Sequence, residues 1–177
     1  MPQSVTVESQ RATYSYRAAD FTPCANATDT MVLQGANGKC IRLTKIGISG
    51  SATAASLLDI YITKRTVAQD SGGTSTTPTP TKYDSYDPNP AGKITLYTAN
   101  PLTFAGVPLE GDTIYLPAQA TPAGEPTHWM IDYSGIKAKC PILRKDYESF
   151  AINFNGQTIP AGTSLYMYME CTEEAGA

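Results

Sequence analysis

The sequence has little charge, and its basic residues are not clustered. Lys, Arg, Asp and Glu make up 16% of the 177 residues, against roughly a quarter in an average globular domain. The net charge is -3, and no basic run is longer than a pair such as Lys64-Arg65 or Arg144-Lys145. Because nucleic-acid binding requires a basic patch, we expect no nucleic-acid partner. The length suits one domain.

Catalytic and metal-binding patterns are also missing. The chain has one histidine, His128, beside Trp129 in an alternating segment. A hydrolase triad requires a nucleophile, a base and a group that orients the base. The segment Gly47-Ile48-Ser49-Gly50 lacks the final glycine of the G-x-S-x-G motif. We therefore expect no enzyme activity, no cofactor and no metal ion.

The cysteines are few and show no C-x-x-C spacing, which argues against a zinc site. They are Cys24, Cys40, Cys140 and Cys171. Cys171 continues the inward phase of a predicted strand, as a small buried apolar residue would. Cys24 and Cys40 flank another predicted strand, so a disulfide between them is an alternative, although disulfides rarely persist in a reducing cytosol.

Long apolar runs are absent. No stretch approaches the roughly 20 apolar residues that a membrane span requires. The start of the chain, MPQSVTVESQ, has no basic segment followed by an apolar run, as a secretory signal would have. We therefore expect no membrane partner and synthesis in the cytoplasm.

What the sequence does contain is alternation, most clearly in residues 40–66, where two predicted strands are joined by a turn of Gly, Ser and Ala. The first strand has two apolar pairs, Ile41 with Leu43 and Ile46 with Ile48. In a regular strand these two pairs would face opposite sides of the sheet. Both can face the core only if one residue is inserted, which predicts a β-bulge near Thr44–Lys45.

The second strand of this segment places Leu58, Ile60 and Ile62 on one face. A helix through Ala52–Arg65 is the alternative, because its first half is rich in alanine. The run of β-branched and aromatic residues that begins at Ile60 favours a strand. The two strands are predicted to pair at the centre of a sandwich.

Two further hairpins are predicted from turn residues. Asn37-Gly38 separates a strand at 30–33 from the strand at 40–48, and residues 149–154 are expected to pair with residues 164–171. Eight or nine strands and no helix predict an all-β fold, an antiparallel two-sheet sandwich of jelly-roll or related Greek-key type. Residues 1–28 would form an N-terminal arm and the first strands, and residues 29–177 the sandwich domain.

Residues 67–92 differ from the rest, since they contain four prolines, five threonines and almost no aliphatic residue. This composition predicts a long contact loop that is ordered mainly by another chain. A calcium site at Asp70, Asp84 and Asp87 is an alternative, but their spacing fits no EF-hand, which favours a solvated acidic loop.

Tyrosine is the most abundant aromatic residue, with 11 copies against 4 Phe and one Trp. The predicted protein-contact residues are Tyr14, Tyr16, Tyr83, Asp84, Tyr86, Asp87, Tyr166 and Tyr168. Tyr166 and Tyr168 occupy the polar face of the last predicted strand. Two interpretations stay open: ordinary pairing of tyrosines across a sheet surface, or a surface that contacts protein or sugar.

Three runs resemble small structural proteins of tailed bacteriophages. They are RLTKIGISGSATAASLLDIYITKRT, GGTSTTPTPTKYDSYDPNPAGKITLYTANP and FAINFNGQTIPAGTSLYMYMECTEE. The resemblance covers roughly residues 11 to 174. It implies a capsid decoration (cement) protein on the outer surface of the virion head, made in the host cytoplasm. Its partners would be the major capsid protein and copies of itself, as a homotrimer.

The resemblance brings no catalytic residues, and the four cysteines depart from the family's usual pattern, which leaves open a thiol-specific role in the particle. The alternative function is a carbohydrate- or host-surface-binding β-sandwich module of a phage tail, fibre or head fibre. Exposed tyrosines and Trp129 support this alternative. A small hydrolase has almost no support in the sequence.

Overall fold

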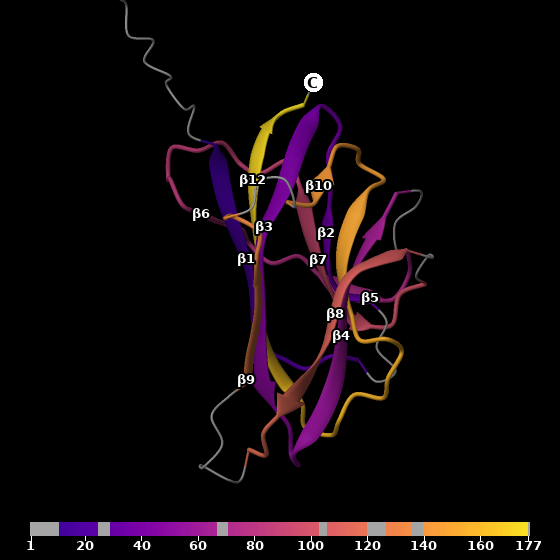
Figure 1. Cartoon of the computed structure of the whole chain (residues 1–177). Coiled ribbons are helices and arrows are strands. Elements are labelled where there is room, and N and C mark those ends of the chain that lie inside the picture. Colours follow the sequence, from indigo (N-terminus) through magenta and orange to yellow (C-terminus); the bar gives the residue numbers. More distant parts are fainter. Residues whose placement is uncertain are drawn as a thin grey trace, which may run out of the picture.

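The computed structural model describes residues 11–24, 29–66, 71–102, 106–119, 127–135 and 140–176. Throughout these residues the regular elements are β-strands, which form two antiparallel six-stranded sheets packed face to face (Figure 1). The predicted all-β sandwich is confirmed.

Sheet A has the order β6-β1-β12-β3, with β9 and β10 both paired to β3. Its strands are β1 (Ala12–Phe21), β3 (Lys39–Ser51), β6 (Thr81–Lys82), β9 (Thr127–Asp132), β10 (Ile142–Leu143) and β12 (Ser164–Ala175). Sheet B has the order β5-β7-β2-β11-β4-β8. Its strands are β2 (Asp29–Gln34), β4 (Ser56–Arg65), β5 (Thr74–Thr76), β7 (Lys93–Ala99), β8 (Val107–Leu116) and β11 (Ser149–Asn153).

The connections follow the jelly-roll pattern. Sheet A contains the row β1-β12-β3-β9, and sheet B contains the row β2-β11-β4-β8. Strands in the same position of the two rows follow each other in the chain: β1 and β2, β11 and β12, β3 and β4, β8 and β9. Each of these four connections therefore crosses from one sheet to the other. A double-sheet barrel of eight strands with this alternation is a jelly roll. The segment between β4 and β8 adds β6 beside β1, and β7 and β5 beside β2, which widens both sheets on the same side.

The three predicted hairpins are wrong for the same reason. Asn37 and Gly38 do form a turn, with Gly38 at φ 72°, but the strands on either side lie in different sheets. The same holds for β3 with β4 and for β11 with β12. Turn residues specify a reversal of the chain but not whether the two arms pair side by side. These arms instead bury their apolar faces against each other across the core.

The predicted bulge is confirmed at Thr44. Lys45 pairs with Glu170 and Leu43 with Cys171, so Thr44 is the extra residue. Its hydroxyl donates to the carbonyl oxygen of Glu170 at 2.9 Å. The bulge lets all four apolar residues of β3 face the core: Ile41, Leu43, Ile46 and Ile48 are each 0% exposed.

The strand prediction for β4 is confirmed and the helical alternative is excluded. β4 begins at Ser56, and Leu58, Ile60 and Ile62 are fully buried. They pack in the main core with Phe150 and residues of sheet A.

The four cysteines are free, so the alternative disulfide between Cys24 and Cys40 is not formed. Cys171 is fully buried, as predicted, and burial raises the pKa of its thiol. The Cys24 thiol donates to the side-chain oxygen of Asn100 at 2.7 Å.

Candidate functional site

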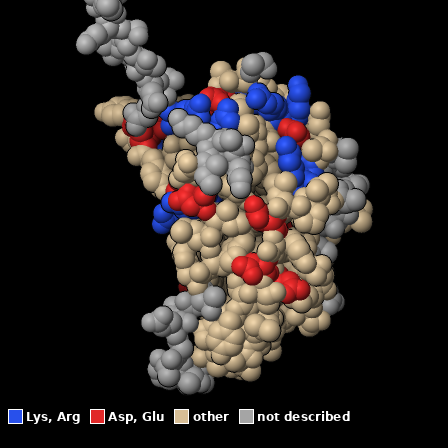
Figure 2. All heavy atoms as spheres, in the orientation of Figure 1, with Lys and Arg blue, Asp and Glu red and all other residues tan. Residues whose placement is uncertain are grey.

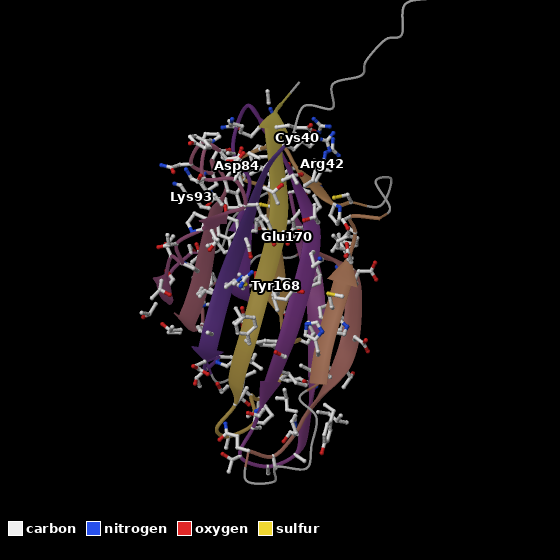
Figure 3. The ribbon with its side chains drawn as sticks, turned by 90° about the vertical axis from the view of Figure 1, so that its left-hand side faces the viewer. Cys40, Arg42, Asp84, Lys93, Tyr168 and Glu170 are labelled. Atoms are coloured by element: carbon white, nitrogen blue, oxygen red, sulfur yellow. The ribbon has the colours of Figure 1, made fainter. Side chains whose placement is uncertain are left out.

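The outer face of sheet A carries Tyr168 and Glu170 of the last strand (Figure 3). The core-facing residues of β12 are Leu165, Met167, Met169 and Cys171. Tyr166, Tyr168 and Glu170 alternate with them and face outward. On the neighbouring strand β1, Arg17 lies opposite Tyr168 and Ser15 lies opposite Glu170. The register of two strands about 150 residues apart therefore assembles one polar and aromatic surface.

A pocket of about 140 Å³ lies on this surface, and we call it the tyrosine pocket. Its lining residues are Ser15, Arg17, Tyr83, Tyr166, Tyr168 and Glu170. Tyr83 comes from residues 83–92, the segment after β6. Its backbone N–H donates to the carbonyl oxygen of Thr13 at 3.1 Å, and its hydroxyl donates to the Glu170 carboxylate at 2.5 Å. Three separate segments of the chain thus converge on the pocket.

A glycine on the neighbouring strand β3 determines where the ring of Tyr168 lies. Tyr168 pairs with Gly47 on β3. A Cβ atom at Gly47 would lie 2.2 Å from Cε1 of Tyr168 and 2.7 Å from its hydroxyl oxygen, so the ring crosses directly over the glycine. No other residue type leaves room for this arrangement.

The charges around the pocket are balanced. The Glu170 carboxylate raises the pKa of Tyr83 through their hydrogen bond, and it is also the main cause of the raised pKa of Lys45. Lys45 pairs with Asp132 at 3.5 Å. The Arg17 Nε donates to the Ser15 hydroxyl at 3.2 Å. Among the described residues no carboxylate lies within ion-pair distance of Arg17, so its guanidinium is available to a ligand.

The segment after β6 is held in place by hydrogen bonds within the chain, contrary to the expectation that another chain orders it. The Glu173 carboxylate is 7% exposed and accepts hydrogen bonds from the backbone N–H groups of Ala91 and Gly92, both at 2.9 Å. The Lys82 ammonium group donates to the Asp87 carbonyl oxygen at 2.7 Å. Polar contacts replace the aliphatic contacts that this segment cannot supply.

Tyr14 and Tyr16 were expected at a contact surface, but they lie in the core at 0% and 1% exposed. The Tyr14 hydroxyl donates to the Pro88 carbonyl oxygen at 2.8 Å, and the Tyr16 hydroxyl donates to that of Gly92 at 3.3 Å. Because both hydroxyls find a carbonyl partner, these tyrosines can point inward on the face that strand β1 shares with the core. They anchor the segment instead of contacting a partner.

The remaining predicted residues lie beyond the pocket. Tyr86 is 96% exposed at the tip of the segment. The Asp84 carboxylate accepts from the Tyr86 backbone N–H at 2.9 Å, and the Asp87 carboxylate accepts from that of Thr13 at 3.4 Å. Asp84 therefore shapes the turn, and Asp87 ties the segment to the start of β1. Asp70, the third residue of the calcium alternative, lies outside the described residues.

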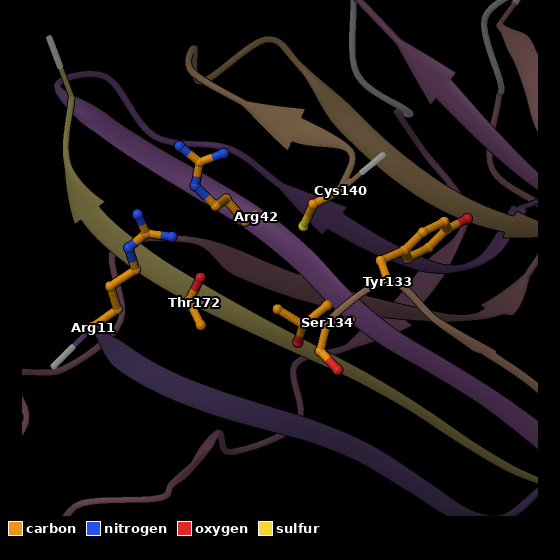
Figure 4. A pocket seen from close by; sticks show the side chains of 7 residues that line it. Arg11, Arg42, Tyr133, Ser134, Cys140 and Thr172 are labelled. Atoms are coloured by element: carbon orange, nitrogen blue, oxygen red, sulfur yellow. The ribbon is translucent and has the colours of Figure 1, made fainter. Parts of the chain in front are cut away.

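A second hollow of about 340 Å³ lies near the end of sheet A where β1 begins (Figure 4). Arg11 and Arg42 line one side of it and Tyr133 the other. Both arginines pair with the carboxylate of Glu174, at 2.9 and 2.8 Å. Since that carboxylate is shared, the two guanidinium groups are already partly neutralised.

The described residues contain no group of three or more His, Cys, Asp or Glu side chains placed to hold a metal ion. The same part of the chain has no helix that could cross a membrane. His128 is exposed on β9 opposite Ser49.

Comparison with known proteins gives no relative: no protein-family model, curated protein or solved structure matches the chain.

Sequence reasoning found the three tyrosines of the pocket but missed Ser15, Arg17 and Glu170. Nothing local marks these residues, because the β1–β12 register alone brings them together.

Proposed function

We propose that this chain is a non-enzymatic structural virion protein that decorates a bacteriophage capsid and stabilises it by clamping neighbouring shell subunits. Its partners are the major capsid protein and further copies of the chain, as a homotrimer on the outer surface of the capsid. The resemblance over residues 11–174 and a surface suited to protein contact support this proposal.

The observation that carries the proposal is an end of the sandwich where the segments that the structure describes carry no charge, which we call the uncharged end. Segments 51–57, 117–119 and 157–163 contain no charged residue. They meet through backbone hydrogen bonds, from Ala52 to Pro117 at 3.0 Å and from Thr53 to Ala161 at 2.9 Å. In Figure 2 the Lys and Arg side chains of the visible face gather in its upper half, away from this end. The centres of protein interfaces are depleted of charge in the same way.

Two large apolar side chains border the uncharged end. Leu57 and Tyr115 face each other across β4 and β8, and they are 66% and 49% exposed. An exposed apolar pair next to these uncharged segments favours contact with another protein.

A contact made by the uncharged end would be repeated at every copy of the chain on the capsid, and this repetition can make it sufficient for stabilisation. On a symmetric shell, many modest contacts add by multivalency, so no single contact need be strong. The acidic balance of the chain also suits the outside of the head, since a protein packed against DNA would be expected to carry positive charge.

The test compares virions with and without the chain. Stripped particles should release DNA at a lower temperature than intact ones, and adding the purified chain should restore the original temperature. The double variant Leu57→Asp, Tyr115→Asp should fold but fail to restore it. Tyr147→Asp, on a 46% exposed tyrosine near the opposite end, should restore it fully. Equal release temperatures for stripped and intact particles would refute the proposal.

A second candidate is a carbohydrate- or host-surface-binding module. The tyrosine pocket is the specific observation that favours it, because three tyrosines surround a small polar hollow.

A further inference from the structure

The tyrosine pocket has the composition of a binding site for one small polar ring. Three of its six lining residues are tyrosines, which supply apolar ring surface together with hydroxyl groups. The other three are Ser15, Arg17 and Glu170. Ligand sites combine apolar walls with a few placed polar groups in this way.

The size of the pocket limits the ligand. At about 140 Å³ it is well below the roughly 300–1,000 Å³ typical of sites for drug-sized molecules. One six-membered ring is therefore the largest unit that it can enclose, and any longer ligand must extend over the surface of sheet A.

The polar groups select the chemistry of that ring. Arg17 offers only donors and the Glu170 carboxylate offers only acceptors. A bare phosphate or sulfate would be repelled by Glu170. An apolar ring would offer no partner to the donors of Arg17 other than Nε, or to the acceptor sites of Glu170 that Tyr83 leaves free. A polyhydroxylated ring satisfies both, since each hydroxyl donates and accepts. The opposite charges of Arg17 and Glu170 favour a ring without charge.

The position of Tyr168 completes the site. Its ring lies across Gly47, which fixes its position, and the side chain is half-buried. A ring held in one place loses little freedom on binding and can support the C–H face of a sugar.

We propose that the tyrosine pocket binds one neutral pyranose unit of a saccharide. The sugar ring packs on Tyr168, and its hydroxyls bond to Arg17 and Glu170. This proposal rests on the second candidate function, a carbohydrate-binding module, and names its ligand; it does not depend on the role in the virion. The pocket is on the outer face of sheet A, while Leu57 and Tyr115 belong to sheet B, so one copy can serve both purposes.

The experiment titrates the purified full chain with a panel of neutral hexoses and the matching uronic acids, followed by backbone amide shifts in NMR. At least one neutral hexose should saturate shifts centred on residues 166–170 and 47. Arg17→Gln and Tyr168→Ala should each weaken that binding by about tenfold or more. The matched control Tyr147→Ala, an exposed tyrosine outside the pocket, should leave it unchanged.

The uronic acids test the charge argument. They should bind wild type no more tightly than their neutral parents, and Glu170→Gln, which removes the negative charge, should reverse that order. The proposal is overturned if no neutral hexose shifts the pocket residues, if Tyr168→Ala binds as well as wild type, or if only acidic ligands or acidic peptides bind. Because this experiment uses the isolated chain, a negative result does not affect the capsid test described above.

Discussion

The ring of Tyr168 lies directly over Gly47, its partner across β12 and β3, with Cε1 2.2 Å from where a Cβ atom would stand. Gly47→Ala should therefore displace the ring and abolish the tyrosine pocket. The fold should survive, with unfolding free energy changed by no more than about 1 kcal/mol, because the obstructing atoms belong to the end of a flexible side chain. Aromatic NMR signals of Tyr168 and denaturant unfolding report the two effects.

A double-mutant comparison separates the effect of displacing the Tyr168 ring from the effect of the glycine on the backbone. In a Tyr168→Ala background the three atoms nearest the new methyl group are gone, so Gly47→Ala should stabilise the strand by about 0.5–1 kcal/mol. In the wild-type background this gain should be offset by displacement of the ring. Equal effects in the two backgrounds would show that the two residues are not coupled.

The two faces of β12 should respond differently to the same charge. Met167→Asp places a carboxylate in the core at a position that is 0% exposed, and this variant should not fold. Tyr168→Asp, one residue later on the outer face, should keep the far-UV circular dichroism and elution volume of wild type. Equal damage from both would mean that a neighbouring subunit buries the outer face as well.

Alkaline pH should destabilise the protein through its buried tyrosines. Burial, assisted by Glu173 and Asp87, raises the pKa of Tyr14 from 10.0 to about 12, and burial raises the pKa of Tyr16 as well. Above pH 10 the unfolded chain releases protons that the folded chain retains, so stability falls as the pH rises from 10 toward 12. Below pH 10 this contribution is fully present.

Phenolate absorbance and urea unfolding at pH values on both sides of 10 measure this effect. Tyr14→Phe should reduce the loss of stability above pH 10, whereas Tyr86→Phe, on a side chain that is 96% exposed, should not. If the Tyr14→Phe variant loses stability with the same pH profile as wild type, Tyr14 is not a source of the effect.

The sequence was sufficient to predict features that depend on which face of a strand each residue occupies. Two apolar pairs of opposite parity can both be buried only if a residue is inserted, and Thr44 is that residue. The assignment of strands to sheets could not be predicted in this way. The Asn37-Gly38 turn has the same local chemistry whether its arms pair in one sheet or cross to the other, and only the packing of the whole core decides.

The direction of the tyrosine side chains could be predicted only in part, for a related reason. Tyr166 and Tyr168 alternate with strongly apolar residues, so their outward direction is visible in the sequence. Tyr14 and Tyr16 alternate with Thr, Ser and Arg, and tyrosine is compatible with either face. Their inward direction depends on carbonyl partners in residues 88–92, which lie more than 70 positions away.

Glu173 gives the sharpest test of what holds residues 88–92 in place. Its buried carboxylate accepts two backbone hydrogen bonds, from Ala91 and Gly92. Glu173→Ala leaves both N–H groups unpaired and should cost about 2–4 kcal/mol of unfolding free energy. Amide exchange at positions 91 and 92 should accelerate, and proteases should cut the segment sooner.

The adjacent Glu174 provides the control. Its side chain is 29% exposed and pairs with Arg11 and Arg42 near the surface, so Glu174→Ala should cost less than Glu173→Ala, about 1 kcal/mol or less, and leave exchange at 91 and 92 unchanged. If Glu173→Ala also leaves that exchange unchanged in the isolated chain, the carboxylate does not hold the segment. The original expectation, that a second chain orders it, would then regain its support, and protection of the same amides should appear only when the partner is added.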